Sequence, residues 1–231
     1  ATSILCSYTD SVKKLDIIRQ GKPLTLTVHL QSQYIPEKNK EQDVTWKRLS
    51  SQIGYIDVRS MVEGVDKQFS EALKSLNNLP YLIVDIRENT GGNSSVGDFI
   101  AQHLIKGERT IWNGTKLSPS ADAYKGKVIV LEGPVTASAA ESFLITMKES
   151  GDAIVVGTPS AGDTGGNPRL FKTTYGMYYW IPIGHLFKYS PKGFPLEGKG
   201  IKPHYLVPMK VNDFLLGKDT QLSYAEELIR K

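Results

Sequence analysis

Apolar and polar residues follow two alternating periods along the chain, and these predict strands and helices in turn. Strand patterns occur at 53–58, 81–87, 127–133 and 152–157, and those at 81–87 and 127–133 are nearly all apolar, which is typical of strands buried on both faces. Helical patterns with an apolar face occur at 65–78, 95–105, 137–150 and 219–231. Strands that alternate with helices predict a parallel sheet with right-handed crossovers, so the fold class is α/β.

Two segments depart from this alternation. Residues 23–31 alternate apolar and polar side chains, as a half-buried strand does, and a highly charged stretch after them predicts an exposed loop and a second strand. We expect residues 1–50 to be the remnant of an N-terminal accessory module or a linker, and residues 51–231 to form one core domain. β-branched and aromatic residues around a glycine predict a hairpin at 171–184.

The composition is that of an ordinary globular protein, with 231 residues, 40% hydrophobic and 23% charged. The net charge of +4 is small and the lysines are scattered, so we expect no nucleic acid partner. The apolar runs are far shorter than the roughly 20 residues that span a bilayer, so no membrane span is expected. The single cysteine, Cys6, excludes an intramolecular disulfide and a thiolate metal cage. No motif indicates a nucleotide or metal, and we expect no cofactor.

Two strand–helix junctions carry candidate chemistry, because ligands of open α/β sheets bind outside the carboxyl ends of the strands. At the first junction a buried strand leads into Gly91 and Gly92, whose amides can face a cavity as an oxyanion hole; a plain turn is the alternative. At the second, Ser138 stands between alanines where a helix begins. Ser138 is either a nucleophile or an N-cap, with Glu141 completing a capping box.

Other polar residues give weaker signals. Asp85 and Arg87 alternate on a buried strand and are expected to pair or to accept backbone hydrogen bonds. Glu197 is a loop carboxylate or an orienting acid. The four histidines lie far apart, and we expect each to have a surface or packing role rather than a catalytic one: His29, His103, His185 and His204.

Taken in order, these segments resemble the carboxy-terminal processing peptidase family. The likeness covers residues 50–230 and includes "LIVDIRENTGGN", "KVIVLEGPVTASAAESF", "IVVGTPSAGDTGGNP" and "LEGKGIKP". It implies a crotonase-like fold of stacked β-β-α units with a mainly parallel core sheet, so that residues 51–231 would be a peptidase core. It also implies a serine peptidase that acts on polypeptides, at an extracytoplasmic location.

The resemblance assigns roles to residues at both junctions. Ser138 matches the nucleophile of the family, and the backbone amides of Ala139 and of Gly91 or Gly92 match its oxyanion hole. A serine at the start of a helix lies at the positive end of the helix dipole, which favours an oxyanion there. The substrate is expected to lie extended along an exposed strand, held by main-chain hydrogen bonds.

The chain differs from part of the family in the residue expected to act as the general base. Asp163 stands where tail-specific members carry a lysine, and residues 149–171 contain no lysine, so a Ser–Lys dyad is not expected. Residues 160–168 are more similar to the tricorn and retinoid-binding branch. The tricorn members use a histidine from an N-terminal region, supported by a glutamate that Glu197 matches. We therefore expect a chain that lacks the segment carrying the base. His204 stands where the family usually has an aspartate.

Two functions from different classes fit these observations. The leading hypothesis is a serine endopeptidase core acting by acyl transfer, with the base supplied by a missing N-terminal region. The alternative is a catalytically inactive module that binds a peptide or an apolar ligand, because a fold does not fix a function. Retention of Ser138 and the glycine pair favours the enzyme. An acyl-CoA enzyme of crotonase type has less support, because no adenine-binding signature occurs. The oligomeric state is not predicted.

Overall fold

The computed structural model describes residues 12–29, 42–184 and 188–230. Cys6, His185 and most of the predicted charged loop lie outside these residues. The chain divides into two units, Ala1–Glu41 and Gln42–Lys231.

The described part of the first unit is a hairpin. Strands β1 (Val12–Arg19) and β2 (Lys22–His29) pair antiparallel around a turn at Gln20 and Gly21, which both have positive φ. Strand β2 was expected from its alternating pattern. The proposal that residues 1–50 derive from an accessory module stays a prediction.

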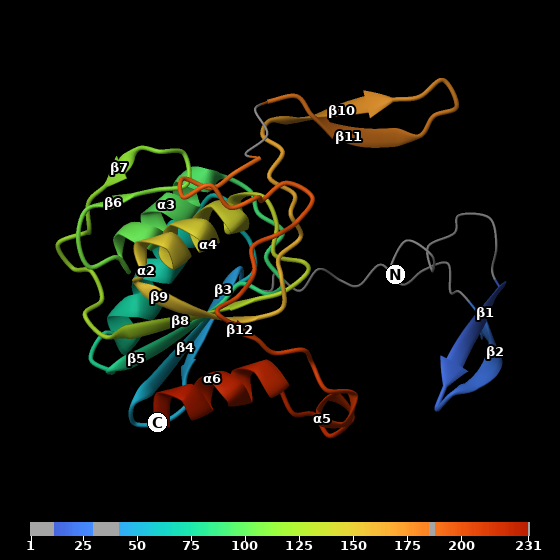
Figure 1. Ribbon diagram of the computed structural model, residues 1–231, viewed down its shortest axis with the longest axis horizontal. Coiled ribbons are helices and arrows are strands. Elements are labelled where there is room, and N and C mark those ends of the chain that lie inside the picture. The colour runs from blue at the N-terminus through green and yellow to red at the C-terminus, as the bar shows by residue number, and fades with distance from the viewer. Residues whose placement is uncertain (1–11, 30–41, 185–187, 231) are drawn as a thin grey trace. The chain divides into compact units, whose positions relative to one another are not determined.

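A six-stranded sheet forms the centre of the second unit, in the order β12-β9-β8-β5-β4-β3 (Figure 1). Its strands are β3 (Val44–Arg48), β4 (Ile53–Val58), β5 (Tyr81–Asp85), β8 (Lys127–Glu132), β9 (Ala153–Gly157) and β12 (Tyr205–Leu206). All neighbours run parallel except β3 and β4, which are antiparallel. The predicted α/β fold with a mainly parallel core sheet is therefore confirmed. Because β3 belongs to this sheet, the second unit begins before residue 51.

Helices cover both faces of the sheet (Figure 1). The larger apolar core lies under α2 (Val65–Leu76), α3 (Ser94–Gln102) and α4 (Ala139–Ser150). A smaller apolar cluster lies on the opposite face, against α6 (Thr220–Arg230). Successive residues of a strand point to opposite faces, so Val84 packs in the larger core and Ile83 in the smaller cluster.

An ion-pair network fastens the start of α6 to the sheet. The Arg87 guanidinium donates hydrogen bonds to Asp85 and to Asp219, each at 2.6 Å. The hydroxyl of Tyr55 donates to Asp85 at 2.7 Å. The expected pairing of Asp85 with Arg87 is therefore present, and it satisfies a carboxylate that is almost fully buried.

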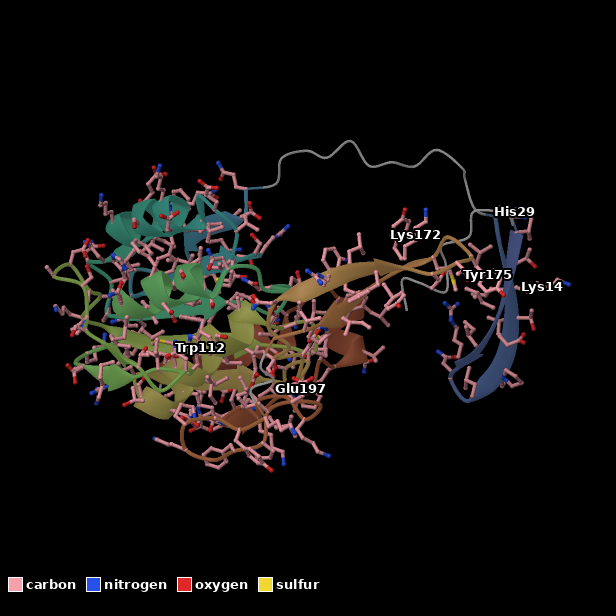
Figure 2. All side chains as sticks on the ribbon, turned by 90° about the horizontal axis from the view of Figure 1, so that it is seen from above. Lys14, His29, Trp112, Lys172, Tyr175 and Glu197 are labelled. Atoms are coloured by element: carbon pink, nitrogen blue, oxygen red, sulfur yellow. The ribbon has the colours of Figure 1, made fainter. Side chains whose placement is uncertain are left out.

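The remaining elements are short or project from the sheet. Strands β6 (Arg109–Thr110) and β7 (Lys116–Leu117) pair with each other, and α5 (Val211–Leu215) is a single exposed turn of helix. The expected hairpin is formed by β10 (Pro168–Lys172) and β11 (Tyr178–Pro182), and it extends away from the core (Figure 2). Within the described ranges no helix is both long and apolar enough to cross a bilayer.

Candidate active site

The two junctions singled out in the sequence follow neighbouring parallel strands. Strand β5 pairs with β8, with Asp85 opposite Leu131, so the carboxyl ends of both strands reach the same edge of the sheet. The turn after β5 contains Gly91 and Gly92, and the turn after β8 leads to Ser138. The sheet register therefore places both turns side by side at this edge.

The two turns are in direct contact at Gly91, which has a φ of +99°. A Cβ at this position would lie 2.7 Å from the Cβ of Ser138 and 2.8 Å from the carbonyl oxygen of Ala137. The Ala137 N–H also donates to the carbonyl of Asn89 at 3.1 Å. Only a residue without a side chain allows this approach of the two backbones.

Asn89 determines which glycine amide is available. This buried side chain accepts the Gly91 N–H on Oδ1 at 2.9 Å and donates from Nδ2 to the carbonyl of Val58 at 2.9 Å. The amides of Gly92 and Ala139, by contrast, have no hydrogen-bond acceptor in the part of the chain that the structure describes. Of the three predicted oxyanion donors, the Gly91 amide is thus already hydrogen-bonded, whereas the amides of Gly92 and Ala139 are not.

Ser138 is the N-cap residue of α4 and has an unusual backbone conformation, with φ 53° and ψ −121°. Positive φ in a non-glycine residue is strained, and such strain is concentrated at functional sites. Ser138 occupies the expected N-cap position, and its amide donates to the Glu141 carboxylate at 3.2 Å, which is the backbone half of the predicted capping box. It does not exclude the nucleophile role, because Ser138 is half-buried and lines a cavity.

Glu141 does more than complete the capping box. Its carboxylate accepts hydrogen bonds from the Ser160 hydroxyl (2.6 Å) and from the amides of Gly162 (2.8 Å) and Asp163 (3.0 Å), as well as from the Ser138 amide (3.2 Å). Burial raises the pKa of Glu141 above its usual value, and these donors oppose that shift. The carboxylate thereby fixes the loop at 160–163 against the start of α4.

A cavity of about 440 Å³ opens at this point. Its walls include Gly92, Ser138 and Ala139 from the two junctions, together with Trp112 from the β6–β7 connection. The remaining lining residues are Asn93, Ser94, Ser142, Thr164, Gly165, Gly166, Asn167 and Pro168. Among these lining residues there is no histidine, lysine or carboxylate, so the described wall of the cavity has no general base.

Glu197 is connected to the cavity through Thr164, which lines it. Its carboxylate accepts the Thr164 N–H at 2.9 Å and also the Thr164 hydroxyl, while the Gly198 N–H donates to the carbonyl of Gly162 at 2.7 Å. Glu197 is half-buried and does not itself line the cavity. Its geometry is that of a side chain that holds the 162–166 loop in place.

The described histidines of the second unit lie elsewhere. His103 is buried, with Nδ1 at 2.8 Å from the carbonyl of Phe99, and His204 accepts the Val155 N–H on Nδ1 at 2.9 Å. Neither lines the cavity beside Ser138. No cluster of three potential ligands for a metal ion occurs in the ranges that the structure describes.

Glu132, at the end of β8, is a buried carboxyl group without a hydrogen bond. Neither carboxyl oxygen has a partner among the described residues, and the nearby Ser160 amide donates instead to the carbonyl of Ile201 at 3.2 Å. Burial raises the pKa of Glu132 to about 9, with Lys148 opposing the shift and Glu141 adding to it. The carboxyl group is therefore neutral at pH 7, although it lies near the charged groups of α4.

Sequence inspection missed several residues that shape this site. Asn89 carried a signal, because an asparagine two residues before a glycine is typical of turns in which the side chain accepts a backbone amide. Glu141 was recognised only as a capping residue. Trp112 and Thr164 carried no signal, since only the folded chain brings them to Ser138.

The fold and the site together define a class: an α/β protein with a strained serine at a helix N-terminus and unpaired backbone amides in the wall of the same cavity, an arrangement typical of serine hydrolases. The model for Peptidase family S41 matches residues 52–207. The chain belongs to this family of serine-type peptidases. The family and fold class expected from the resemblance are therefore confirmed.

Relatives and solved structures agree with this assignment. The chain is 26% identical over 182 residues to the tricorn protease of Thermoplasma acidophilum, covering 78% of this chain and 17% of that protein. It is 26% identical over 241 residues to a carboxyl-terminal-processing protease of a Picosynechococcus species, covering 96% of this chain and 53% of that protein. A crystal structure of the tricorn protease superposes with a TM-score of 0.58 at 26% identity, covering 77% of this chain and 17% of that chain. The chain thus spans about half or less of the curated relatives described here.

Replacement of Gly91 tests the contact between the two turns. We expect Gly91→Ala to lower the free energy of unfolding by about 3 kcal/mol or more, because strain at positive φ adds to a clash with Ser138 and Ala137. Gly151→Ala is the matched control, since Gly151 also has positive φ (+76°) but nothing lies within 4 Å of its added Cβ; it should cost about 1 kcal/mol. Urea denaturation followed by circular dichroism measures both, and equal losses would contradict the contact.

Replacement of Glu132 tests the buried neutral carboxyl group. Its folded-state pKa of about 9 lies above the ordinary value of 4.5, so its contribution to stability is full below pH 4.5 and is lost as the pH rises through 9. Relative to Glu132→Gln, the wild type should therefore lose stability between pH 5 and 9, by at most about 1.4 kcal/mol per pH unit. Urea denaturation at several pH values measures this, with Glu71→Gln on the exposed face of α2 as control. Parallel pH profiles for wild type and Glu132→Gln would disprove the shift.

Proposed function

We propose that this chain is the core of a serine endopeptidase in which Ser138 is the nucleophile. The observation that carries the proposal is the single cavity shared by Ser138 and by the unpaired amides of Gly92 and Ala139. Membership of a serine peptidase family supports it. The activity, substrate and partners of the whole protein are part of the proposal, because the chain spans only part of its relatives.

In the proposed reaction, Ser138 Oγ attacks the carbonyl carbon of a peptide bond and a tetrahedral oxyanion forms. The Gly92 and Ala139 amides donate to that oxygen, and the N-terminus of α4 adds a favourable dipole. Of the two glycines, we assign Gly92 because the Gly91 amide is already bonded to Asn89. The amine leaves with a proton, and water then hydrolyses the acyl-enzyme to release the acid and regenerate Ser138.

The general base of the proposed enzyme comes from outside the described cavity wall. The lining residues offer no group that accepts a proton from Ser138, and the residue at the family's lysine position, Asp163, is exposed and contributes its carbonyl to the Ser138 amide at 2.8 Å. A histidine is the expectation carried by the resemblance to the tricorn branch. It would be supplied by another part of the full-length protein.

Glu197 is proposed as a positioning residue. By binding both the amide and the hydroxyl of Thr164, it holds one wall of the cavity beside Ser138. A direct action on the missing base, which the resemblance implies, stays a prediction.

The proposed substrates are polypeptides bound in an extended conformation. The carboxyl-terminal-processing protease and the tricorn protease among the relatives support this class of substrate. Strand β10 begins at Pro168, a residue of the cavity wall, and its exposed backbone offers a surface for strand addition. An extracytoplasmic location is proposed from the family resemblance.

One observation favours the second candidate, an inactive binding module on the same scaffold. The described wall of the cavity lacks a base, and a cavity without a base can bind a peptide without cleaving it. The free amides beside Ser138 favour the enzyme, because binding alone does not require an oxyanion hole.

Covalent labelling of Ser138 tests the proposed function. We expect a fluorophosphonate to label the full-length protein once per active site, because the reagent reacts with an activated serine whose oxyanion is stabilised. Ser138→Ala should abolish labelling and the turnover of a casein-like substrate. Intact-protein mass spectrometry and a proteolysis assay measure the two effects.

Ser142 provides the control for this experiment. It lies in the same cavity wall, one turn along α4, but inside the helix rather than at its N-cap, with its own amide bonded to the Ser138 carbonyl at 3.1 Å. Ser142→Ala should therefore retain labelling. Equal labelling of Ser138→Ala and wild type would refute the nucleophile, and ligand retention without turnover in the wild type would establish the binding module instead.

Two replacements of Glu197 test its positioning role. Glu197→Gln keeps an oxygen acceptor for Thr164, so we expect kcat/KM to fall less than about tenfold, whereas Glu197→Ala leaves the loop unsupported and should lower it by about 100-fold. Steady-state kinetics on a peptide substrate measure both. A loss in Glu197→Gln as large as that in Glu197→Ala would show that charge, rather than the contact with Thr164, is what matters.

A further inference from the structure

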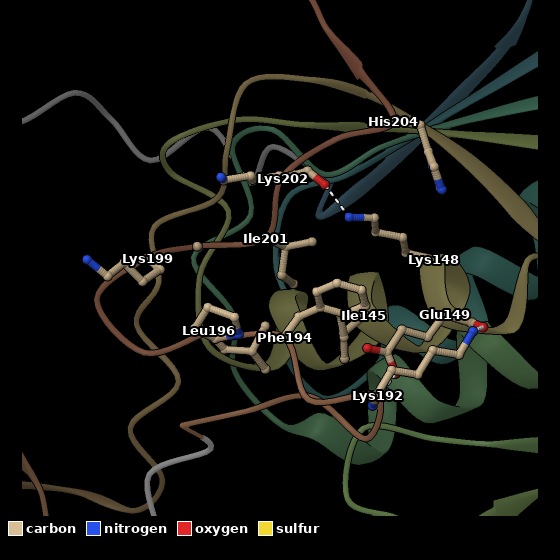
Figure 3. Close-up of a pocket in the computed structure, with 12 residues that line it drawn as sticks. Ile145, Lys148, Glu149, Lys192, Phe194, Leu196, Lys199, Ile201, Lys202 and His204 are labelled. Atoms are coloured by element: carbon tan, nitrogen blue, oxygen red, sulfur yellow. Dashed lines mark hydrogen bonds between the residues drawn. The ribbon is translucent and has the colours of Figure 1, made fainter.

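A second cavity, of about 530 Å³, lies against the other end of α4 (Figure 3). Its apolar lining is formed by Ile145, Phe194, Leu196 and Ile201. Lys148 belongs to this cavity and is ten residues beyond Ser138, which places it about 15 Å along the helix. The volume and the apolar lining are typical of sites for small molecules.

One end of this cavity presents two hydrogen-bond donors, the Lys148 ammonium group and the His204 ring. Lys148 and His204 lie together on one side in Figure 3, and the Lys148 ammonium group donates one hydrogen bond to the carbonyl of Lys202. The Nδ1 of His204 accepts the Val155 N–H at 2.9 Å, so the neutral ring carries its proton on Nε2. Burial and the charge of Lys148 lower the pKa of His204, which keeps the ring neutral at pH 7.

The charges around the cavity are strongly unbalanced. Four lysines line it, and the only carboxylate among the lining residues, Glu149, lies against Lys192. There Lys192 donates its N–H to Glu149 Oε2 at 3.3 Å and its ammonium to the Glu149 carbonyl at 2.6 Å. Lys148 forms no ion pair within the described ranges. Burial lowers its pKa, and the charge of Glu149 opposes that shift. The neighbouring Glu132 is neutral at pH 7 because its pKa is about 9.

We propose that this cavity binds a small organic carboxylate with an apolar body. The carboxylate accepts hydrogen bonds from the Lys148 ammonium and from His204 Nε2, and the apolar body packs on Phe194 and Ile145. Charge-assisted bonds of this kind are stronger than neutral ones, and they supply the counter-charge that Lys148 lacks. The site also gives His204 a role as a hydrogen-bond donor.

The geometry favours a free small molecule over a segment of the polypeptide substrate. Ile145 and Leu196 also line a gap of about 10 Å³ that separates this cavity from the one beside Ser138. A gap of that size holds no more than about one water molecule, so the enclosed space between the two cavities is too small for a peptide chain. The proposal goes beyond the peptidase function and does not depend on it.

Calorimetric titration of the chain at pH 7 tests the site with three matched probes. 4-Phenylbutanoate carries both the carboxylate and the apolar body, 4-phenylbutan-1-ol carries only the body, and acetate carries only the head. We expect saturable binding of 4-phenylbutanoate at one site per chain, with the other two at least tenfold weaker. Lys148→Gln and Phe194→Ala should each raise the Kd at least tenfold, which corresponds to about 1.4 kcal/mol.

Lys74→Gln, on the exposed face of α2, is the control and should leave the Kd unchanged. If Lys148→Gln unfolds at the assay temperature, His204→Phe replaces it, because this change removes the second donor. Absence of saturable binding overturns the proposal, as does equal binding of the alcohol and the carboxylate. The peptide acetyl-Ala-Ala-Phe serves as a further probe: if it binds more than tenfold tighter than 4-phenylbutanoate, the occupant is a polypeptide terminus and the proposal fails.

Discussion

The site depends on two backbone turns that meet with no room for a side chain between them. At Gly91 the chain passes so close to Ser138 and Ala137 that even a methyl group would overlap them. This contact exists because β5 and β8 are paired in parallel and end at the same edge of the sheet. Asn89 fixes the turn by accepting the Gly91 amide, whereas the next amide, that of Gly92, lies at the cavity wall without an acceptor among the described residues. A serine and its candidate oxyanion donors are thus positioned by main-chain geometry rather than by flexible side chains.

Two carboxylates hold the 160–166 loop, part of which lines this cavity. Four donors surround the carboxylate of Glu141, and two groups of Thr164 bind Glu197, so the cost of removing these charges from water is offset by hydrogen bonds. Glu132 shows the opposite case: without donors, it remains protonated at neutral pH. The protonation of Glu132 also affects the second cavity. A neutral Glu132 does not compete with an anion for the charge of Lys148.

Much of the architecture was predictable because it rests on local periodicity. Strands β5 and β8 are apolar at nearly every position, and both were expected within two residues of their observed ends. The helix expected at 95–105 ends at Gln102, since the following amides bond three residues back in a tighter turn, as His103 does to Ile100. Strand β1, with its mixed and largely exposed residues, gave no clear period. At the site, Ser138 and the glycines were found from the order of motifs, whereas the contacts of Glu141 with 160–163 join segments about twenty residues apart and have no sequence signature.

A crystal structure of the full-length protein with a peptide boronate bound at Ser138 would show which backbone amides hold the oxyanion. The account predicts one boronate oxygen between about 2.7 and 3.1 Å from the backbone nitrogens of both Gly92 and Ala139, with the Gly91 amide still bonded to Asn89. A boronate attached to another side chain, or an oxygen held by donors other than these two amides, would contradict it.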